Sequence, residues 1–272
     1  MELEKECSAK KSKKVKKYAG SVEKYIKKKL NKNFLHFSLI DPDPSKTRIE
    51  YVKDVIKKLE EAGTDAIMIG GSTGVKNSFL DEVAISIKES CSLPVILFPG
   101  NPETGISKYA DAIFFLCLMN AKDIRFATGY QSIGARIVKS YGIEPIPVGY
   151  IIIEPGMTVG KNAELIRRDD IDKAIGYALA AQYMGMRLVY LEAGSGAYEP
   201  VPLEMIKAVK HEIDIPLIVG GGIKTEEQAK NAIIAGADII VTGTIIEKDI
   251  KKSIEIVKAI KSLKRRKLKN KR

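Results

Sequence analysis

Hydrophobic residues in this chain form short apolar runs that alternate with longer segments of mixed polarity. Short apolar runs closed by Gly, Pro or Asp are typical of buried strands, and apolar residues recurring every three to four positions are typical of amphipathic helices. The runs predict eight strands, at Phe34–Ile40, Asp65–Ile69, Pro94–Phe98, Asp111–Leu118, Val148–Ile153, Leu188–Glu192, Ile215–Val219 and Asp238–Thr242. The mixed segments predict helices at Arg48–Ala62, Ser78–Glu89, Phe126–Ser140, Asp169–Met184, Leu203–His211, Glu226–Ala235 and Ile250–Leu263.

Eight strands alternating with helices predict an α/β fold, a (β/α)8 TIM-like barrel, in which active residues lie at the carboxyl ends of the strands. One unit departs from this pattern. Only residues Pro99–Ala110 separate the third strand from the fourth, and they include Pro and Gly. We therefore expect the third helix to be short or missing, which leaves a gap in the ring of helices.

Charge divides the chain into three parts. The net charge is +11, but residues 1–30 carry +7 and residues 261–272 carry +8, so the remaining body is at −4. We expect a basic N-terminal extension at 1–20, a single barrel domain at 21–262 that begins with a helix capped by Ser21, and a basic C-terminal tail at 263–272. The basic ends are either solvated or in peripheral contact with an anionic membrane. No aromatic residues interleave with the C-terminal basic run, so we expect no nucleic-acid partner.

The composition points to a globular protein of the cytoplasm. No apolar run approaches the ~18 residues of a membrane span, and the Lys-rich start has no apolar segment after it, as a signal peptide would. The three cysteines, Cys7, Cys91 and Cys117, are widely separated and odd in number. This pattern predicts free thiols in a reducing compartment.

Glycine-rich loops follow the last three predicted strands. They are Ala193–Gly196, Gly220–Gly222 and Gly243–Thr244. Glycine lets backbone N–H groups approach an anion closely, and loops after the seventh and eighth strands of such barrels commonly bind phosphate. The alternative is that these glycines only form tight turns. Three such loops at one end favour a phosphate ligand.

Oxygen-bearing side chains follow the first two strands. Asp41 and Asp43 come after the first, and Ser72 and Thr73 come after the second. Carboxylate and hydroxyl oxygens are hard ligands of the kind that Mg²⁺ prefers, with waters and substrate phosphates completing its shell. A turn or cap before Pro is the other reading of Asp41.

Tyr190 and Glu192 are two residues apart in the sixth strand, so both side chains point to the same face. A Glu beside a phosphate pocket can act as a base or stabilise a cation, although a buried structural salt bridge is also possible. His36 has the opposite parity to Asp41, and we expect it to pack. The acidic run Asp169–Asp172 is better explained by the start of a helix than by a metal site.

Several of these segments together resemble one known family, the archaeal geranylgeranylglyceryl phosphate synthases, over residues 21–262. The matching segments are His36–Asp43, Gly70–Thr73, Glu154–Met157, Ala178–Gly185, Tyr190–Gly196, Val219–Ile223 and Thr242–Thr244. The resemblance implies a (β/α)8 prenyltransferase that joins sn-glycerol 1-phosphate to geranylgeranyl diphosphate with Mg²⁺. Bacterial relatives carry Lys two positions before the metal aspartate, and Leu39 stands there, which favours the archaeal branch.

The resemblance also assigns residues. It implies that Asp41 and Ser72 bind Mg²⁺ and that Glu192 and Tyr190 take part in catalysis. The glycerol-phosphate site that it implies comprises Tyr190, Leu191, Glu192, Ala193, Gly194, Ser195, Gly196, Gly221, Gly222, Gly243 and Thr244. We also expect a homo-oligomer, of a size that the sequence does not give.

Three alternatives stay open at this point. The same reaction with a prenyl chain of another length fits the same residues. Another phosphate-binding barrel, such as a flavin oxidoreductase or a sugar-phosphate isomerase, has similar glycine-rich loops but does not explain Asp41 together with Ser72. A non-catalytic protein that binds nucleic acid or membrane through its basic ends is the third.

Overall fold

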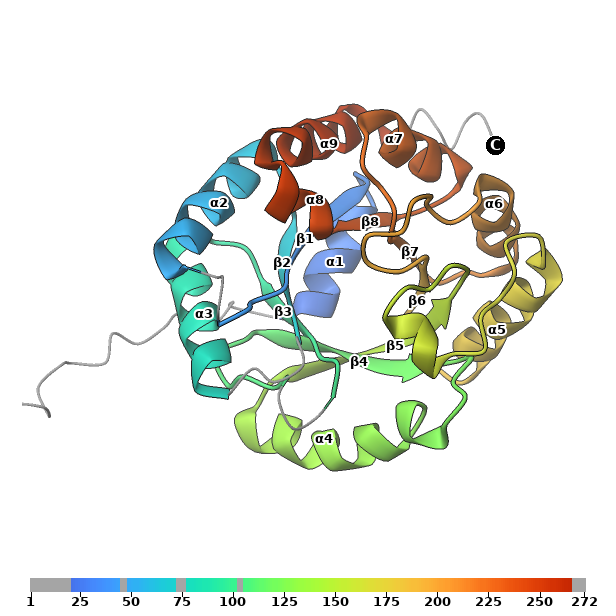
Figure 1. Cartoon of the computed structure of the whole chain (residues 1–272), viewed down its shortest axis with the longest axis horizontal. Helices are drawn as coiled ribbons and strands as arrows, with labels where there is room; N and C mark the ends of the chain where they lie inside the picture. The colour runs from blue at the N-terminus through green and yellow to red at the C-terminus, as the bar shows by residue number, and fades with distance from the viewer. Residues whose placement is uncertain (1–20, 45–47, 72–76, 102–104, 266–272) are drawn as a thin grey trace, which may run out of the picture.

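The computed structural model describes residues 21–44, 48–71, 77–101 and 105–265. Eight parallel strands, β1 to β8, close into a barrel in sequence order (Figure 1). The strands are β1 (Leu35–Ile40), β2 (Ala66–Gly70), β3 (Val95–Phe98), β4 (Ala112–Leu118), β5 (Glu144–Ile152), β6 (Leu188–Glu192), β7 (Leu217–Gly220) and β8 (Ile239–Thr242). The predicted (β/α)8 fold is confirmed.

Helices form an outer ring around this barrel. They are α2 (Ile49–Ala62), α3 (Asn77–Ser90), α4 (Gly129–Tyr141), α5 (Ile171–Tyr183), α6 (Leu203–Glu212), α7 (Glu226–Ala235) and α9 (Ile250–Ser262). The short α8 (Thr244–Lys248) lies inside this ring, between α9 and the barrel (Figure 1). Two 3₁₀ turns, η2 (Ile124–Phe126) and η3 (Val159–Asn162), precede α4 and α5. Among the described residues no helix joins β3 to β4, so the predicted gap in the ring is confirmed.

An additional helix, α1 (Val22–Leu30), closes the amino-terminal end of the barrel. Val22, Ile26 and Leu30 are buried in one cluster with the side chains that fill the barrel interior. Ser21 caps the helix as predicted, because its hydroxyl accepts a hydrogen bond from the Lys24 N–H at 3.3 Å. The carboxylate of Glu144 accepts from the Val22 N–H at 2.5 Å, which ties the start of α1 to β5.

Three aspartates predicted as the first residues of strands lie just before them. Asp65, Asp111 and Asp238 are buried, and each accepts a hydrogen bond from the backbone N–H of a neighbouring strand, at 3.0, 2.9 and 2.9 Å. Each also forms an ion pair with a lysine: Lys29 with Asp65, Lys88 with Asp111 and Lys210 with Asp238. In the second pair, Lys88 Nζ lies 2.6 Å from Asp111 Oδ1. Because these groups lie at the end opposite the active face, they serve stability rather than chemistry.

Strand β5 begins four residues earlier than predicted, at Glu144 instead of Val148. The added residues include Pro145 and Pro147, and proline has no N–H to donate to a sheet ladder. In the structure, Glu144 N donates to Asp111 O on the β4 side, so the alternating proline nitrogens face β6. Pairing with β6 starts only at Val148, so no ladder hydrogen bond is lost.

The structure also tests the predictions for His36 and for the cysteines. His36 is fully buried, with Nδ1 2.9 Å from Thr64 Oγ1 and Nε2 2.9 Å from Thr242 Oγ1, so the expectation that it packs is confirmed. Cys91 and Cys117 are free thiols, whereas Cys7 lies outside the described residues, as do most of the two basic ends.

A search of the described helices finds none with the length and apolar character needed to span a bilayer.

Candidate active site

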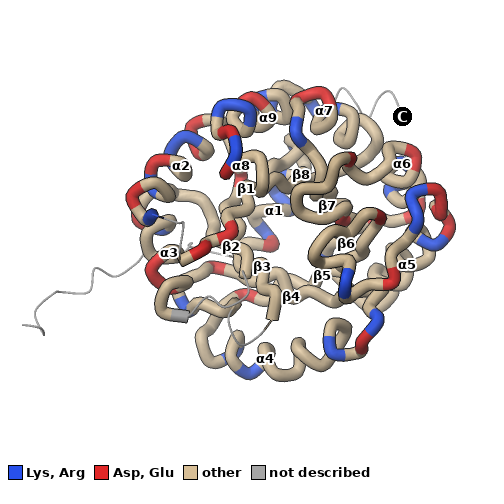
Figure 2. The backbone as a smooth tube through the Cα atoms, viewed as in Figure 1, with Lys and Arg blue, Asp and Glu red and all other residues tan. Residues whose placement is uncertain are grey.

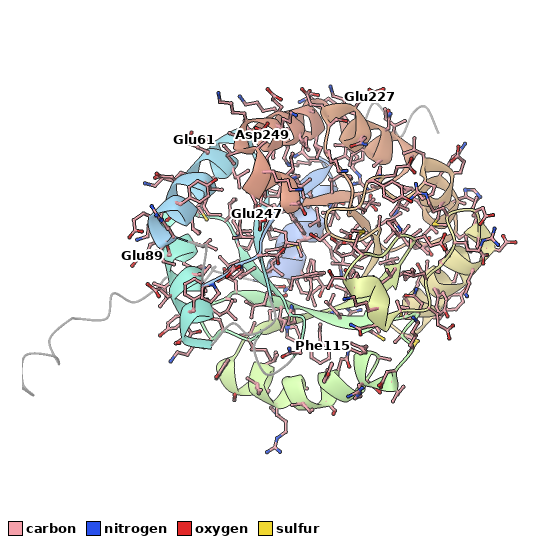
Figure 3. All side chains as sticks on the ribbon, in the orientation of Figure 1. Glu61, Glu89, Phe115, Glu227, Glu247 and Asp249 are labelled. Atoms are coloured by element: carbon pink, nitrogen blue, oxygen red, sulfur yellow. The ribbon has the colours of Figure 1, made fainter. Side chains whose placement is uncertain are left out.

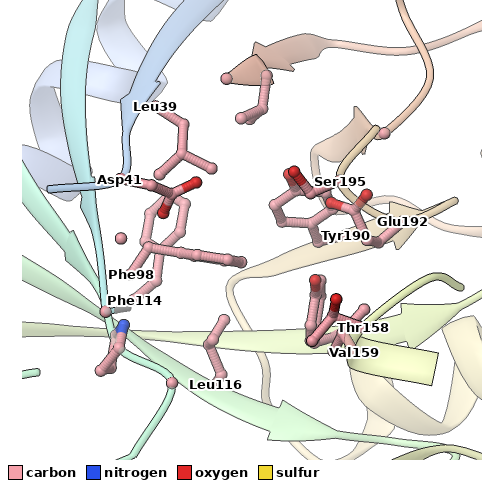
Figure 4. Close-up of a pocket in the computed structure, with 18 of the residues that line it drawn as sticks. Leu39, Asp41, Phe98, Phe114, Leu116, Thr158, Val159, Tyr190, Glu192 and Ser195 are labelled. Carbon is pink, nitrogen blue, oxygen red and sulfur yellow. The ribbon is translucent and has the colours of Figure 1, made fainter. Parts of the chain in front are cut away.

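A cavity of about 1040 Å³ lies at the carboxyl end of the barrel, where active sites of this fold are found. It has an apolar part and a polar part (Figure 4). The apolar part, called here the apolar tract, is lined by Phe98, Ile106, Ile113, Phe114, Phe115, Leu116, Leu118, Phe126, Tyr130, Gly134, Val138 and Val159. The polar part is lined by side chains and glycines from the loops after β1, β6, β7 and β8.

The apolar tract passes from the inside of the barrel to the outside of β4. Phe114 belongs to the core cluster inside the barrel, whereas Ile113 belongs to the cluster between the strands and the outer helices. Side chains of both orientations line the cavity, and Figure 3 shows Phe115 between β4 and α4. This path exists because no described helix follows β3 to cover the outer face at that point.

Three aromatic rings lie where the two parts of the cavity meet. Tyr150 is 5.2 Å from Tyr190 and 5.5 Å from Phe98 between ring centroids, and Phe98 is 5.7 Å from Tyr190. Tyr190 is 1% exposed, and burial raises its pKa well above the usual value for a phenol. The rings therefore form a neutral, electron-rich surface beside the polar part.

Glu192 is the buried carboxylate of the polar part. Its Oε1 accepts a hydrogen bond from the Gly194 N–H at 2.7 Å, and the Tyr190 hydroxyl also donates to it. Burial is the main cause that raises the pKa of Glu192 to about 7, with the like charge of Asp41 acting in the same direction, while these two hydrogen bonds lower it. Near neutral pH the group therefore exchanges a proton readily, as a general base must.

The glycine-rich loops come together around Glu192. Gly221 and Gly222 have φ of 79° and 72°, in the left-handed region that favours glycine. A Cβ on Gly221 would overlap Glu192 Oε1, and a Cβ on Gly222 would lie 2.8 Å from Pro200 N. The loops after β6 and β8 are joined by a 2.9 Å hydrogen bond between Ser195 Oγ and Thr244 Oγ1.

Asp41 lies across the polar part from Glu192 (Figure 4). Burial raises the pKa of its carboxyl, and among the described residues it has no hydrogen-bond or ion-pair partner. Ser72, the other residue expected to bind metal, lies outside the described residues. Over the part of the chain that the structure describes, no group of three or more His, Cys, Asp or Glu side chains is arranged to hold a metal.

The family model described as the PcrB family matches residues 24–261, which is most of the chain. The chain belongs to the PcrB family. The geranylgeranylglyceryl phosphate synthase of Pyrococcus horikoshii is 60% identical over 231 residues, covering 84% of this chain and 90% of that protein. The synthase of the same name from Sulfolobus acidocaldarius is 47% identical over 253 residues, covering 92% and 97%.

A solved structure of the (S)-3-O-geranylgeranylglyceryl phosphate synthase from Thermoplasma acidophilum, in complex with its substrate sn-glycerol-1-phosphate, is also similar. The TM-score is 0.85 at 43% identity, and the match covers 90% of this chain and 100% of that chain. The resemblance found in the sequence motifs is thereby confirmed.

Within this PcrB family barrel, most residues assigned from the sequence line the cavity. They are Tyr190, Glu192, Ser195, Gly196, Gly221, Gly222, Gly243, Thr244 and Asp41. Leu191 and Ala193 instead point into the core between the strands and the helices. The Ala193 N–H donates to Gly220 O and its carbonyl accepts from Gly156 N, so Ala193 supports the loop. Gly194 contributes the N–H that holds Glu192.

Several residues that line the cavity were not expected from the sequence. Phe98 and Tyr150 complete the aromatic cluster, and Lys224 adds a cation after β7. Their positions at or near the carboxyl ends of strands could have indicated them. Phe98 is the last residue of β3, and Tyr150 lies opposite Tyr190 where β5 pairs with β6.

Proposed function

We propose that this chain is a prenyltransferase that joins geranylgeranyl diphosphate to sn-glycerol 1-phosphate, giving geranylgeranylglyceryl phosphate and diphosphate. The bond from the prenyl C1 to the diphosphate oxygen breaks, the C3 hydroxyl oxygen of the glycerol takes its place, and the hydroxyl proton leaves. The observation that carries this proposal is one cavity that joins an apolar tract to a glycine-lined polar part, with Glu192 and three aromatic rings at the junction. The names of the similar synthases support it.

The polar part holds the glycerol phosphate in this proposal. The backbone of Gly221, Gly222 and Gly243 allows a phosphate to approach without obstruction by side chains, and Ser195 and Thr244 offer hydroxyls. Lys224 lines the same part of the cavity and adds a positive charge. Fixing the phosphate there places the glycerol near Glu192 and raises its effective concentration at the prenyl carbon.

Glu192 acts as the general base. It is buried, it faces the cavity, and its pKa is raised to about 7, mainly by burial. The Gly194 N–H and the Tyr190 hydroxyl fix the orientation of its carboxylate. Accepting the C3 hydroxyl proton makes the glycerol oxygen a better nucleophile, which typically contributes ~10²–10⁴-fold to the rate.

Asp41 fits the role of a Mg²⁺ ligand. It is a half-buried carboxylate with no cationic partner among the described residues, and a hard divalent cation would relieve the cost of its partial burial. Ser72 and the oxygens of the diphosphate would complete the site, since no third acidic residue is arranged there among the described ones. When bound, Mg²⁺ would neutralise the departing diphosphate.

The apolar tract and the aromatic cluster bind the prenyl donor. The tract runs along β4 under α4 and removes the hydrocarbon chain from water. Phe98, Tyr150 and Tyr190 present rings at the junction, where positive charge develops on the allylic carbon, and ring faces attract such charge. Their buried rings also exclude water that would hydrolyse the donor.

Turnover by the purified chain tests this proposal directly. With Mg²⁺, sn-glycerol 1-phosphate and a series of prenyl diphosphates, geranylgeranyl diphosphate should give the highest kcat/KM. Preference for another chain length would change the donor but keep the reaction. Flavin absorbance in the purified protein, or no ether product with any donor, would instead favour another phosphate-binding barrel.

The expected homo-oligomer and the cytoplasmic location are further parts of the proposal. Tyr183 and Met184 at the end of α5 are 79% and 64% exposed, and large exposed apolar side chains of this kind often meet a second copy. Sedimentation velocity of the wild type and of Tyr183→Ser would test that contact, and cell fractionation would test the location.

A further inference from the structure

Helix α4 separates the apolar tract from solvent and has two distinct faces. Tyr130, Gly134 and Val138 recur every four residues and line the cavity. Ile133, Arg136 and Lys139 lie on the other face and are exposed. The wall is therefore one helix thick, with the tract on one side and solvent on the other.

The outer face is more apolar than a solvent-facing helix needs to be. Ile133 is 53% exposed, and Ile124 in η2 is 72% exposed. A Cβ on Gly129 would lie 3.5 Å from the Cβ of Arg125, which places Arg125 of η2 one helical turn before Ile133. We call Ile124, Arg125, Ile133, Arg136 and Lys139 the α4 outer surface.

The charge of this surface differs from that of the rest of the barrel. The α4 helix is the only α-helix within the described residues that has no acidic residue, and residues 124–143 contain three basic residues and no acid. Figure 2 shows no acidic segment along α4. Arg125 is paired with Asp123 at 2.7 Å, but Arg136 and Lys139 form no ion pair with the described residues. This local excess of positive charge contrasts with residues 31–260 as a whole, which carry a net charge of −4.

We propose that the α4 outer surface docks on an anionic lipid surface, with its isoleucines inserted among the headgroups and its basic residues against lipid phosphates. Exposed apolar and basic side chains on one helix are the combination that such surfaces bind. On the proposed function, docking there places the wall of the apolar tract, which takes the prenyl chain, against the membrane. This surface is separate from the basic ends and from the residues assigned to the reaction.

Co-sedimentation of the full chain with vesicles tests this surface without any substrate, so its outcome is independent of the proposed reaction. The vesicles contain phosphatidylcholine alone or phosphatidylcholine with phosphatidylglycerol. The test variants are Arg136→Glu with Lys139→Glu, and Ile124→Ser with Ile133→Ser. Matched controls on the opposite side of the barrel are Lys251→Glu with Lys258→Glu on α9, and Ile234→Ser on α7, where Ile234 is 52% exposed.

The expected result is binding to anionic vesicles that falls at least ~10-fold in the charge variant, since each Lys or Arg near such a surface is worth about a factor of five. The isoleucine variant should also lose binding, whereas both controls should bind like the wild type. Equal loss in the α9 control would mean general charge attraction and would overturn the proposal. Unchanged binding of both α4 variants would overturn it too, and would assign binding to the basic ends. A change of sedimentation coefficient in the α4 variants without vesicles would show a second copy on this surface, which also overturns it.

Discussion

The carboxylate of Asp41 occupies the space that a side chain on Gly70 would need. A Cβ on Gly70 would overlap Asp41 Oδ1 and would lie 3.0 Å from Asp41 Cγ. The two residues are neighbours because Ile40 of β1 pairs with Ile69 of β2, each one position earlier. Glycine at the end of β2 is thus what lets Asp41 turn over the mouth of the barrel and face the cavity.

Gly70→Ala should therefore lower activity without replacing a catalytic side chain. The added methyl group displaces the Asp41 carboxylate, so we expect kcat/KM to fall ~10–100-fold and the Mg²⁺ concentration for half-maximal rate to rise. Steady-state kinetics over a range of Mg²⁺ checks this. Gly176→Ala on α5 is the control, because a Cβ there meets nothing within 4 Å. Normal Mg²⁺ dependence in Gly70→Ala would separate Asp41 from the metal.

Asp41→Asn should give the same defect by removing the charge and keeping the shape. Because Asp41 lies at a loop mouth and no described residue depends on it for a hydrogen bond, the circular dichroism spectrum and Tm should stay close to the wild type. Turnover at limiting Mg²⁺ should fall ~100-fold or more, about 3 kcal/mol of transition-state stabilisation. Near-normal turnover under those conditions would remove Asp41 from the site.

Much of the barrel could be predicted from the order of its residues. Most strands are runs of residues buried on both faces, such as Leu188–Glu192, and most are followed by Gly, Pro or Asp, which mark their ends. The predicted bounds fail where a tertiary partner decides the outcome. The two prolines of β5 are tolerated only because β6 pairs from Val148 onward, and no local pattern contains that information.

The candidate site was only partly predictable for the same reason. Tyr190 and Glu192 share a face by strand parity, so their joint position was visible in the sequence. The pairing of Phe98 and Tyr150 with Tyr190 comes from three separate strands, and the tract along the outer side of β4 depends on the gap in the helical ring. Ala193 was assigned as part of a motif, although its parity turns its side chain into the core.

Gly222→Val should damage glycerol-phosphate binding selectively. The valine is strained at a φ of 72° and would push against the backbone at Pro200, which distorts the loop that supports the phosphate site. KM for sn-glycerol 1-phosphate should rise strongly, and KM for the prenyl diphosphate should change little. Gly185→Val is a matched control, with a φ of 85° and nothing within 4 Å of its Cβ. Equal damage to both substrates with an intact circular dichroism spectrum would contradict this division of the cavity.

The pH profile should report Glu192. A base whose pKa is raised to about 7 is protonated and inactive below that pH, so kcat/KM should rise with pH through about 7 and then level off. Rates measured from pH 5.5 to 8.5, a range of roughly three units around that value, would show this limb. In Glu192→Gln the limb should disappear. A limb retained in that variant would assign it to another group.

Acid should weaken the fold through His36. Burial lowers the pKa of His36 to about 3, below the value of 6.5 for a free imidazole, so the unfolded state binds the proton more tightly. Stability from this residue is complete above pH ~6.5 and is lost as pH falls toward ~3, by up to about 1.4 kcal/mol per pH unit. Imidazole ¹⁵N shifts at pH 5 should show His36 neutral. A charged His36 in the folded protein at that pH would refute this.

Product analysis with wild-type chain and Glu192→Gln tests the central claim most directly, namely that Glu192 acts between two substrates held in one cavity. Both proteins are incubated with Mg²⁺, sn-glycerol 1-phosphate and geranylgeranyl diphosphate, and the ether product and diphosphate are quantified by mass spectrometry. The wild type should release the two in equal amounts. Glu192→Gln should bind both substrates with unchanged Kd and form product ~10²–10⁴-fold more slowly. Equal rates for the two proteins, or diphosphate released by the wild type without ether product, would contradict the account.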